Sequence, residues 1–335
     1  MNINSEKVLV TGASGYIALH CITELIKNGY KVKGSIRDLS KKNKIKNFLK
    51  LNSDDDKFEL CELNLLKDKG WIKAASDCDY LLHIASPCVI KEPKNEFDII
   101  NPAVQGTLRA LDAAKKTNIK KVVLTSSLGS ITYGHQKSIC KPTDWTDITE
   151  DIGSYIRSKT IAEKTAWDYL NSFSSHPFKF TSINPGLVFG PPIANKTKST
   201  SVNLINKMIE GEFPALPNIF FSIVDVRDVA KLHVKSLNNN NSDNKRIIAS
   251  ASESIHFLEI SKILRNLGYK KSPLNSVPNK LLNLLGIFNE DMRISYNMVK
   301  RGYFSVDNSE TKSIFDWDPI PLQKTLEDMC NSLKK

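Results

Sequence analysis

KVLVTGASGYIA, Lys7 to Ala18, is the stretch that decides the fold of this chain. A short apolar run, Val8 to Val10, leads through a glycine turn directly into a helical pattern. A parallel strand joined to a helix in this way exposes the first backbone N–H groups of the helix, and these, together with the helix dipole, bind phosphate groups. The stretch therefore predicts a dinucleotide site.

Individual positions in the turn support this prediction. Gly12 allows a tight turn, Gly15 lets a pyrophosphate approach the backbone, and Ala18 stands where the dinucleotide fingerprint permits Gly or Ala. The helix that follows is expected to end at Asn28-Gly29. One of its faces is apolar and consists of Ile17, Ala18, Cys21, Ile22, Leu25 and Ile26. An ordinary glycine loop is the alternative, but the strand before the turn and the helix after it favour dinucleotide binding.

Length and composition are those of a soluble globular protein. The chain has 335 residues, of which 41% are hydrophobic and 25% charged, enough for one large or two ordinary domains. No apolar run is long enough to cross a bilayer, and the first ten residues lack a basic region followed by an apolar core. We therefore expect a cytoplasmic protein without a membrane partner.

Cysteine spacing argues against a metal-binding protein, and the lack of a suitable motif argues against a nucleic-acid-binding protein. The six cysteines form no C-x-x-C pair and no zinc-finger spacing, so we expect reduced thiols and no metal site. The net charge of +11 is compatible with nucleic-acid binding, but no nucleic-acid motif accompanies it. The charge is equally suited to a phosphorylated cofactor and acidic substrates, and we expect no nucleic-acid partner.

Strand and helix patterns alternate along the first 250 residues. Alternation of this kind predicts an α/β fold of the Rossmann type, with a doubly wound parallel sheet and the ligand at the carboxyl ends of its strands. A first helix is expected to end near Gly29. Further helices are expected at 101–116, 202–209, 254–267, 280–285 and 322–333. Strands are expected at 8–10, 30–36, 57–61, 80–84, 121–125, 178–184 and 245–250.

The end of the second predicted strand indicates the form of the cofactor. Arg37 stands where a Rossmann fold places the adenosine ribose, and a basic residue there accommodates a 2′-phosphate, whereas an acidic one bonds the 2′-hydroxyl of NAD. Asp38 is adjacent and argues in the other direction. Basic residues follow, some of them explained by a solvated helix face: Lys41, Lys42, Lys44 and Lys46. NADP(H) is therefore the predicted cofactor.

Tyr155 and Lys159 lie one turn apart on one face of a predicted helix. A lysine ammonium beside a phenol favours the phenolate, and so brings the hydroxyl closer to a group that exchanges protons at neutral pH. The pair alone is a common structural coincidence. Its order in the chain, after the glycine turn and after Thr125-Ser126-Ser127 at a strand end, favours a catalytic role.

In this order the motifs resemble the extended short-chain dehydrogenase/reductases. The resemblance is to the branch with dihydroflavonol reductases, cinnamoyl-CoA reductases and NADPH-dependent aldehyde and ketone reductases, and it covers about two thirds of the chain. It is carried by VTGASGYIA (10 to 18), IRD (36 to 38), LLHIASP (81 to 87), NPAVQGTLRAL (101 to 111), VVLTSSLGSI (122 to 131), YIRSK (155 to 159), INPGLVFGP (183 to 191) and VDVRDVAKLH (224 to 233).

The resemblance implies a catalytic set of three residues. Tyr155 would donate a proton to the substrate carbonyl oxygen, Lys159 would lower the pKa of the tyrosine and hold the ribose hydroxyls, and Ser127 would polarise the carbonyl. Ser126 is the rival for the last role. Ser127 is preferred because the family's catalytic serine is the last of its serine run.

The resemblance also implies the cofactor contacts. Asn64 departs from the aspartate common at the adenine position, although an amide can still bond the adenine amine. The sixth strand is expected to end at Asn184, because Pro185 cannot continue the ladder. The expected cofactor residues are Gly12, Ser14, Gly15, Tyr16, Ile17, Arg37, Lys44, Asn64, Leu65, Ile84, Ala85, Ser86, Tyr155, Lys159, Pro185, Gly186, Leu187 and Val188.

Two lobes are expected. Residues 1–190, with 223–250 returning to them, would form the NADP-binding domain, and residues 191–222 and 251–335 a smaller substrate-binding lobe that covers the cleft. Within the smaller lobe we expect a polar loop at 196–201, while Phe220 and Phe221 are equally suited to an apolar pocket or to plain core. In the returning segment, Asp225, Arg227 and Asp228 are expected to be structural partners.

Three functions are compatible with these motifs. The first is an NADPH-dependent reductase that transfers a hydride to an aldehyde or ketone, acting as a monomer or homodimer. The second keeps the fold but changes the reaction, as in nucleotide-sugar epimerases and 3β-hydroxysteroid dehydrogenases, against which Arg37 argues. The third is a non-catalytic NADP-sensing protein, which typically loses the tyrosine or lysine that this chain keeps.

Overall fold

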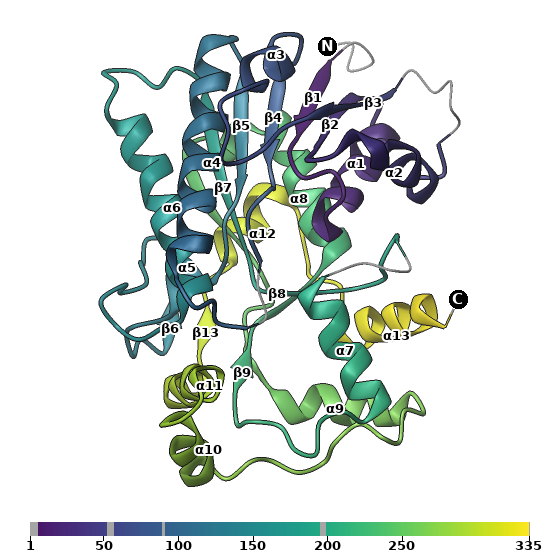
Figure 1. The fold of residues 1–335 in the computed structure, drawn as a ribbon, viewed down its shortest axis with the longest axis vertical. Coiled ribbons are helices and arrows are strands. Elements are labelled where there is room, and N and C mark those ends of the chain that lie inside the picture. Colours follow the sequence, from purple (N-terminus) through teal and green to yellow (C-terminus); the bar gives the residue numbers. More distant parts are fainter. Residues whose placement is uncertain (1–5, 52–56, 89–90, 195–198, 335) are drawn as a thin grey trace.

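A seven-stranded sheet forms the centre of the computed structural model, which describes residues 6–51, 57–88, 91–194 and 199–334 (Figure 1). Every neighbouring pair of strands in it is parallel, and the strand order is β11-β7-β5-β4-β1-β2-β3. This is the predicted doubly wound fold, and it is confirmed. The strands are β1 (Lys7–Val10), β2 (Lys31–Ile36), β3 (Phe58–Glu62), β4 (Tyr80–His83), β5 (Lys121–Thr125), β7 (Lys179–Pro185) and β11 (Lys245–Ala249).

Alternate side chains of the strands enter two separate cores, because successive residues of a strand point to opposite faces of the sheet. On β1, Val8 and Val10 face one core and Leu9 the other. The first core is covered by α1 (Tyr16–Lys27), α2 (Lys42–Phe48), which follows η2 (Leu39–Lys41), and α8 (Val226–Asn238). The second is covered by α3 (Trp71–Ala75), α4 (Phe97–Lys116) and α6 (Ser154–Asn171), with α5 (Gly129–Thr132) packed on α6.

Below the carboxyl ends of the strands lies a second, mainly helical region (Figure 1). Its core is built from α7, α9 and α13, and also receives Tyr16 from α1. Three small two-stranded pairs connect this region to the rest of the chain. The helices are α7 (Thr200–Glu210), α9 (Phe257–Asn266), α10 (Asn279–Gly286), α11 (Glu290–Arg301) and α13 (Leu322–Leu333), and the pairs are β8 (Leu187–Phe189) with β10 (Ile223–Asp225), β9 (Phe220–Phe221) with β12 (Ile255–His256), and β6 (Ile139–Cys140) with β13 (Ser305–Val306).

The last part of the chain returns to the sheet. In α12 (Ser309–Phe315), Thr311 Oγ1 donates to the carbonyl of Ile248 on β11 at 2.9 Å, and Phe315 and Trp317 enter the first core. The short η3 (Asn240–Ser242) connects α8 to β11. The C-terminal segment therefore packs on β11 and the first core. The division into two lobes stays a prediction.

Three expected boundaries are wrong. The helix expected at 254–267 begins only at Phe257, because Ile255–His256 pairs with β9 as strand β12 and the His256 side chain caps α9. The helix expected at 101–116 begins a turn earlier, at Phe97, because Pro102 lies in its second turn and removes only one helical hydrogen bond there. Strand β7 includes Pro185, whose carbonyl still accepts a hydrogen bond from Leu128 N at 2.7 Å. Gly186 N then donates to Ala249 O, so the pairing continues one residue beyond the proline.

Several smaller expectations are also decided. Asp225 caps α8, accepts from Arg227 and receives a hydrogen bond from Thr325, which confirms its structural role. All six cysteines are free. No helix within the described parts of the chain is long and apolar enough to span a membrane. The polar loop expected at 196–201 lies partly outside the described residues, which omit 195–198.

Candidate active site

The turn between β1 and α1 is closed against the end of β4. Gly12 has φ +71°, and a Cβ there would lie 3.1 Å from both Cα and Cβ of Ala85. Gly15 N donates to Gly12 O at 2.8 Å, and Gly15 then caps α1 without any side chain on the cap. The first N–H groups of the helix therefore face outward next to a backbone that leaves room for a ligand.

Three other predicted residues of this turn differ in how their side chains are placed. Tyr16 is buried and its hydroxyl donates to Gly190 O at 2.7 Å, while Ile17 packs between two cores. Ser14 is exposed. The phenol of Tyr16 therefore ties α1 to the chain after β8, and only its N–H is available at the turn.

Thr11 joins the glycine turn to the end of β4. Its Oγ1 accepts hydrogen bonds from Ile84 N and Ala85 N, both at 3.0 Å, and lies 3.1 Å from His83 Nδ1. Burial, followed by the charge of Lys159, lowers the pKa of His83 to about 3, so the ring is neutral. The role of Thr11 was missed from sequence, although its place between the last strand residue and Gly12 is a signal for it.

Arg37 and Lys44 are exposed at the end of β2 and on α2. Asp38 does not compete with them for a ligand, because it caps η2. Its carboxylate accepts from Ser40 N at 3.0 Å and pairs with Lys41 Nζ at 3.3 Å. The acidic residue that argued against a 2′-phosphate therefore has a structural role.

Asn64 and Leu65 follow β3. Asn64 Oδ1 accepts from Leu66 N at 2.9 Å, a local turn that leaves the amide nitrogen of Asn64 for another partner. Leu65 packs closely on α4, where a Cβ on Gly106 would lie 2.5 Å from Leu65 Cδ2. The two residues stand at the edge of the site rather than at its chemical centre.

The connection from β7 to β8 holds the last group of predicted cofactor residues, Pro185 to Val188. A Cβ on Gly186 would collide with the carbonyl of Ser222, and Leu187 N donates to that same oxygen at 2.8 Å. Val188 packs against two cores. The close approach requires glycine at 186 and holds this segment rigidly beside the carboxyl end of β7.

Tyr155 and Lys159 lie on the first turns of α6, beside the end of β5. Tyr155 is partly exposed, and Ser127 is close enough to its hydroxyl to lower the pKa of the phenol. The Oγ of Ser127 accepts a hydrogen bond from Gly129 N at 3.0 Å. Lys159 is buried, and its Nζ donates to Thr125 O at 3.0 Å. The structure thus brings Ser127, Tyr155 and Lys159 together at one sheet edge.

Burial dominates the electrostatics of this group. Burial lowers the pKa of Lys159 to about 8, although the neighbouring Cys88 and the carboxylate of Glu163 act to raise it. The pKa of the Tyr155 phenol is raised by burial and by Cys88, while the neighbouring Ser127 lowers it. The phenol is therefore protonated at neutral pH in this state, as a proton donor must be.

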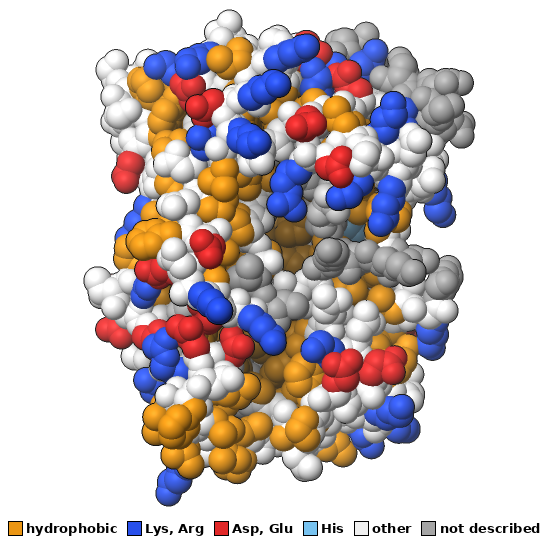
Figure 2. Space-filling view, in the orientation of Figure 1, with side chains coloured by type: hydrophobic (Ala, Val, Ile, Leu, Met, Phe, Trp, Pro, Cys, Tyr) orange, Lys and Arg blue, Asp and Glu red, His pale blue; other side chains and the backbone are white. Residues whose placement is uncertain are grey.

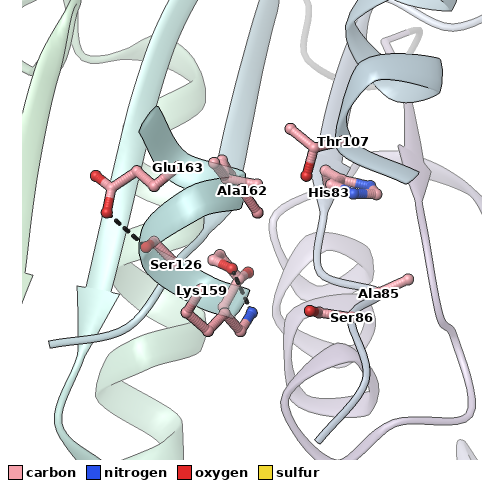
Figure 3. A pocket seen from close by; sticks show the side chains of 10 residues that line it. His83, Ala85, Ser86, Thr107, Ser126, Lys159, Ala162 and Glu163 are labelled. Carbon is pink, nitrogen blue, oxygen red and sulfur yellow. Dashed lines mark hydrogen bonds between the residues drawn. The ribbon is translucent and has the colours of Figure 1, made fainter. Parts of the chain in front are cut away.

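The Ser126 hydroxyl is hydrogen-bonded to a residue other than Tyr155. Its hydroxyl donates to Glu163 Oε2 at 2.6 Å (Figure 3), whereas Ser127 remains partly exposed. Burial would raise the pKa of Glu163, but Arg246 and the surrounding donors lower it to about 2. The donors to this fully buried carboxylate come from α5, α6, β7, β11 and the end of β5: Ser126, Ser130, Trp167, Ser182, Asn184 and Arg246.

Glu163 supports Ser127 indirectly. Ser130 Oγ and Asn184 Nδ2, which both contact Glu163, also donate to the carbonyl of Ser127 at 2.8 and 3.2 Å. These contacts fix the backbone from which the Ser127 hydroxyl projects. The sequence motifs did not reveal Glu163, although its position four residues after Lys159 places it on the same helix face.

Cys88 is a second residue that was missed from sequence. The exposed thiol lies beside the Tyr155 hydroxyl, and its Sγ is 3.5 Å from Thr200 Oγ1 at the start of α7. It follows Ala85-Ser86-Pro87 at the end of β4, so its place at this sheet edge was the available signal. The thiol lies at the mouth of the group formed by Ser127, Tyr155 and Lys159.

The residues present fit a dinucleotide. Ser86 Oγ is buried and finds no hydrogen-bond partner among the described residues, and it lies across a small cavity from Lys159 (Figure 3). An orphaned hydroxyl of this kind is normally satisfied by water or a ligand. It faces the same edge as the uncapped start of α1 and the two exposed basic residues Arg37 and Lys44.

A hollow separates the sheet from the lower helices (Figure 2). The glycine turn and the group of Ser127, Tyr155 and Lys159 define a protein of the short-chain dehydrogenase/reductase type. The model of the NAD dependent epimerase/dehydratase family matches residues 8–249, and the chain belongs to this family. Within it, the chain belongs to the branch of dihydroflavonol, cinnamoyl-CoA and Gre2-type reductases, as the motifs predicted.

Three relatives illustrate the branch. Cinnamoyl-CoA reductase CAD2 of Medicago truncatula is 33% identical over 273 residues, which cover 78% of this chain and 80% of that protein. A bifunctional dihydroflavonol 4-reductase/flavanone 4-reductase of Pyrus communis is 26% identical over 344 residues, covering 97% and 96%. The crystal structure of yeast methylglyoxal/isovaleraldehyde reductase Gre2 complexed with NADPH has a TM-score of 0.81 at 26% identity, and the match covers 98% of both chains.

Proposed function

We propose that this protein is an NADPH-dependent reductase of aldehydes or ketones. The observation that carries the proposal is the gathering of Ser127, Tyr155 and Lys159 at the carboxyl end of β5, beside the glycine turn. The relatives support the same class, because those described above are reductases and one of them was crystallised with NADPH.

The three residues divide the work of carbonyl reduction. When bound, NADPH supplies the hydride that reaches the carbonyl carbon. Tyr155 gives its hydroxyl proton to the carbonyl oxygen, and Ser127 donates a hydrogen bond to the same oxygen. Lys159 would stabilise the phenolate left after proton transfer. In the structure its Nζ donates to Thr125 O, and the pKa of the Tyr155 phenol is raised by burial, so the expected lowering of that pKa by Lys159 is not seen in this state.

The cofactor residues are assigned by position. The start of α1, with Gly12, Ser14, Gly15, Tyr16 and Ile17, would hold the pyrophosphate through backbone N–H groups. Arg37 and Lys44 would bind the 2′-phosphate, and Asn64 and Leu65 would border the adenine. The middle of the cofactor and its nicotinamide end would be bordered by Ile84, Ala85, Ser86, Pro185, Gly186, Leu187 and Val188. Tyr155 and Lys159 would lie at the ribose of the nicotinamide.

Replacement of Tyr155 by Phe tests the proposal. It removes the transferable proton and leaves the ring, so we expect kcat for aldehyde reduction to fall about 10³-fold. NADPH affinity, measured by fluorescence titration, is expected to stay within about twofold of wild type, because the phosphate contacts are untouched. Tyr169→Phe, on the same helix but outside the site, is the matched control and should keep full turnover.

The same assay separates the alternatives. Unchanged turnover in Tyr155→Phe would contradict the proton-donor role. Absence of NADPH oxidation with aromatic and aliphatic aldehydes, α-dicarbonyls and a dihydroflavonol, together with tight NADPH binding, would favour a sensing protein. Stoichiometric NAD retained through purification would instead favour an epimerase.

A further inference from the structure

α6, the helix that carries Tyr155 and Lys159, begins without a capping side chain of its own. The residue before it is Gly153, which has φ +80° and no side chain to accept from the first N–H groups of the helix. A side-chain oxygen of Ser, Thr, Asp or Asn at this position usually satisfies one of those groups. The start of α6 therefore depends on an acceptor from another part of the chain.

Glu92 supplies this acceptor from the segment between β4 and α4, 62 residues earlier in the chain. Its Oε2 accepts a hydrogen bond from Ser154 N at 3.0 Å and another from Ser154 Oγ, and Ser154 directly precedes Tyr155. Its Oε1 lies beside Gly153, where an added Cβ would be 3.0 Å from that oxygen. A carboxylate at this end of a helix is also stabilised by the helix dipole.

The basic residues near Glu92 do not compete with the helix for its carboxylate. The two arginines that line a polar cleft beside Glu92 pair with other carboxylates: Arg157 with Glu96, and Arg293 with Asp151 and Glu290. Lys94, which lines the same cleft, is exposed. Within the described parts of the chain, the hydrogen bonds of the Glu92 carboxylate go to Ser154 alone.

α11, which lies below α6 in Figure 1, holds the same junction from the lower region. Asp291 Oδ1 accepts from the backbone N–H of Glu92 at 2.9 Å. Asn297 Nδ2 donates to the carbonyl of Asp151 at 2.9 Å and to its carboxylate at 2.7 Å. The capping residue and the segment just before α6 are therefore both held by α11.

We propose that Glu92 is a positioning residue, which caps the first turn of α6 and thereby holds the Tyr155 hydroxyl in place for proton transfer; this rests on the proposed function. Helix ends fray, and Tyr155 is the second residue of its helix. Proton transfer requires hydrogen-bonding distance between donor and acceptor, so a small displacement of the phenol slows the reaction. NADPH affinity depends mainly on the phosphate contacts expected at α1, which the cap does not touch.

Steady-state kinetics with NADPH and the most active carbonyl compound of the panel above test this role. Glu92→Ala removes both acceptor oxygens, so we expect kcat to fall about tenfold while the KM for NADPH stays within about twofold. Glu92→Gln keeps one oxygen for Ser154, and kcat should return to within about threefold of wild type. A merely structural cap would lower stability but leave kcat of the folded enzyme unchanged.

Glu96→Ala is the matched control. It removes a carboxylate from the same segment, but one that contacts α6 through the Arg157 side chain and not through the backbone before Tyr155. We expect kcat of this variant to stay within about twofold of wild type. Circular dichroism of each variant separates an effect on the site from a loss of folding.

Hydrogen–deuterium exchange of the full chain gives a readout that does not depend on turnover. In Glu92→Ala the N–H groups at the start of α6 should exchange at least about threefold faster than in wild type, whereas Glu96→Ala should leave them unchanged. Unchanged exchange in Glu92→Ala would overturn the cap itself.

The kinetic outcomes separate this role from the proposed function. Full kcat in Glu92→Ala, in a protein whose wild type reduces carbonyl compounds, would overturn the positioning role and leave the proposed function intact. Equal losses of kcat in Glu92→Ala and Glu92→Gln would also overturn it, because they would assign the effect to charge instead of the hydrogen bonds. Failure of the proposed function appears as a wild type without turnover, and it overturns the positioning role whatever the exchange at α6.

Discussion

Lys159 is a residue at which function opposes stability. Its ammonium is buried, and among the described residues it donates a hydrogen bond to the Thr125 carbonyl. Burial lowers its pKa from 10.5 to about 8, so the folded state binds this proton less tightly than the unfolded state does. Holding a charge there therefore costs folding free energy, and the proposed catalytic role explains why the charge is kept.

Lys159→Met should stabilise the protein while abolishing reductase activity. Removing the buried charge relieves about 3 kcal/mol at pH 7, and the lost bond to Thr125 O returns about 1 kcal/mol of that gain. We expect a net increase of about 2 kcal/mol in the free energy of unfolding, measured by urea denaturation.

The pH dependence of this gain tests its origin. Below pH 8 the lysine is charged in both states, and the full cost is present. Between pH 8 and 10.5 the folded state loses its proton first, so the gain from Lys159→Met should shrink and vanish as pH rises towards 10.5. A gain that does not change with pH would assign the effect to packing instead of charge.

The turn from β1 to α1 determines how tightly the cofactor site is built. At Gly12 two constraints coincide: φ is +71°, and a Cβ would lie only 3.1 Å from Cα and Cβ of Ala85, a contact tighter than ordinary van der Waals distance. Gly268 has the first constraint without the second, since its φ is +99° and nothing lies within 4 Å of an added Cβ. The two glycines therefore separate backbone strain from contact with the end of β4.

Gly12→Ala and Gly268→Ala should both lose about 1 kcal/mol of stability from the positive φ. Only Gly12→Ala should also weaken NADPH binding, by about tenfold, because the turn must move away from Ala85 and from the phosphates. Thermal unfolding and fluorescence titration measure the two effects. Equal NADPH affinity in both variants would show that the turn does not hold the phosphates.

The elements that could be predicted from the sequence are those that depend on residues close together in the chain. The seven sheet strands, α1 and the pairing of Tyr155 with Lys159 on one face of α6 follow from periodicity and turn residues. The partners of Glu163 do not, because Arg246 is 83 residues away and meets it only through the strand order. Thr11 and Cys88 were missed for the same reason, since each acts across two strand ends.

The whole molecule combines a parallel sheet with a chain that crosses it repeatedly. β13 pairs with β6, more than 150 residues earlier in the chain, and α12 packs on β11, where Thr311 bonds Ile248, 63 residues away. No sequence pattern marked these returns, because two-residue strands are too short to show alternation. The positive charge of the molecule, by contrast, follows directly from the sequence.

That charge predicts how salt affects cofactor binding. The chain carries a net +11, and Arg37 and Lys44 are exposed at the proposed 2′-phosphate position. Exposed charges are screened by salt, so raising NaCl from about 50 to 500 mM should weaken NADPH binding about tenfold and NADH binding less. Arg37→Gln should lower NADPH affinity by about 10- to 100-fold, the value of a lost charge-assisted hydrogen bond, and reduce the salt dependence.

Lys42→Gln is the matched control, because it lowers the net charge by the same amount from the same exposed region. If the salt effect came only from the overall charge, both variants would weaken NADPH binding equally. If the salt effect comes from the 2′-phosphate contact, only the Arg37→Gln variant loses the difference in affinity between NADPH and NADH. Titration of both cofactors at two salt concentrations decides between the two, and an unchanged NADPH preference in Arg37→Gln would place the phosphate elsewhere.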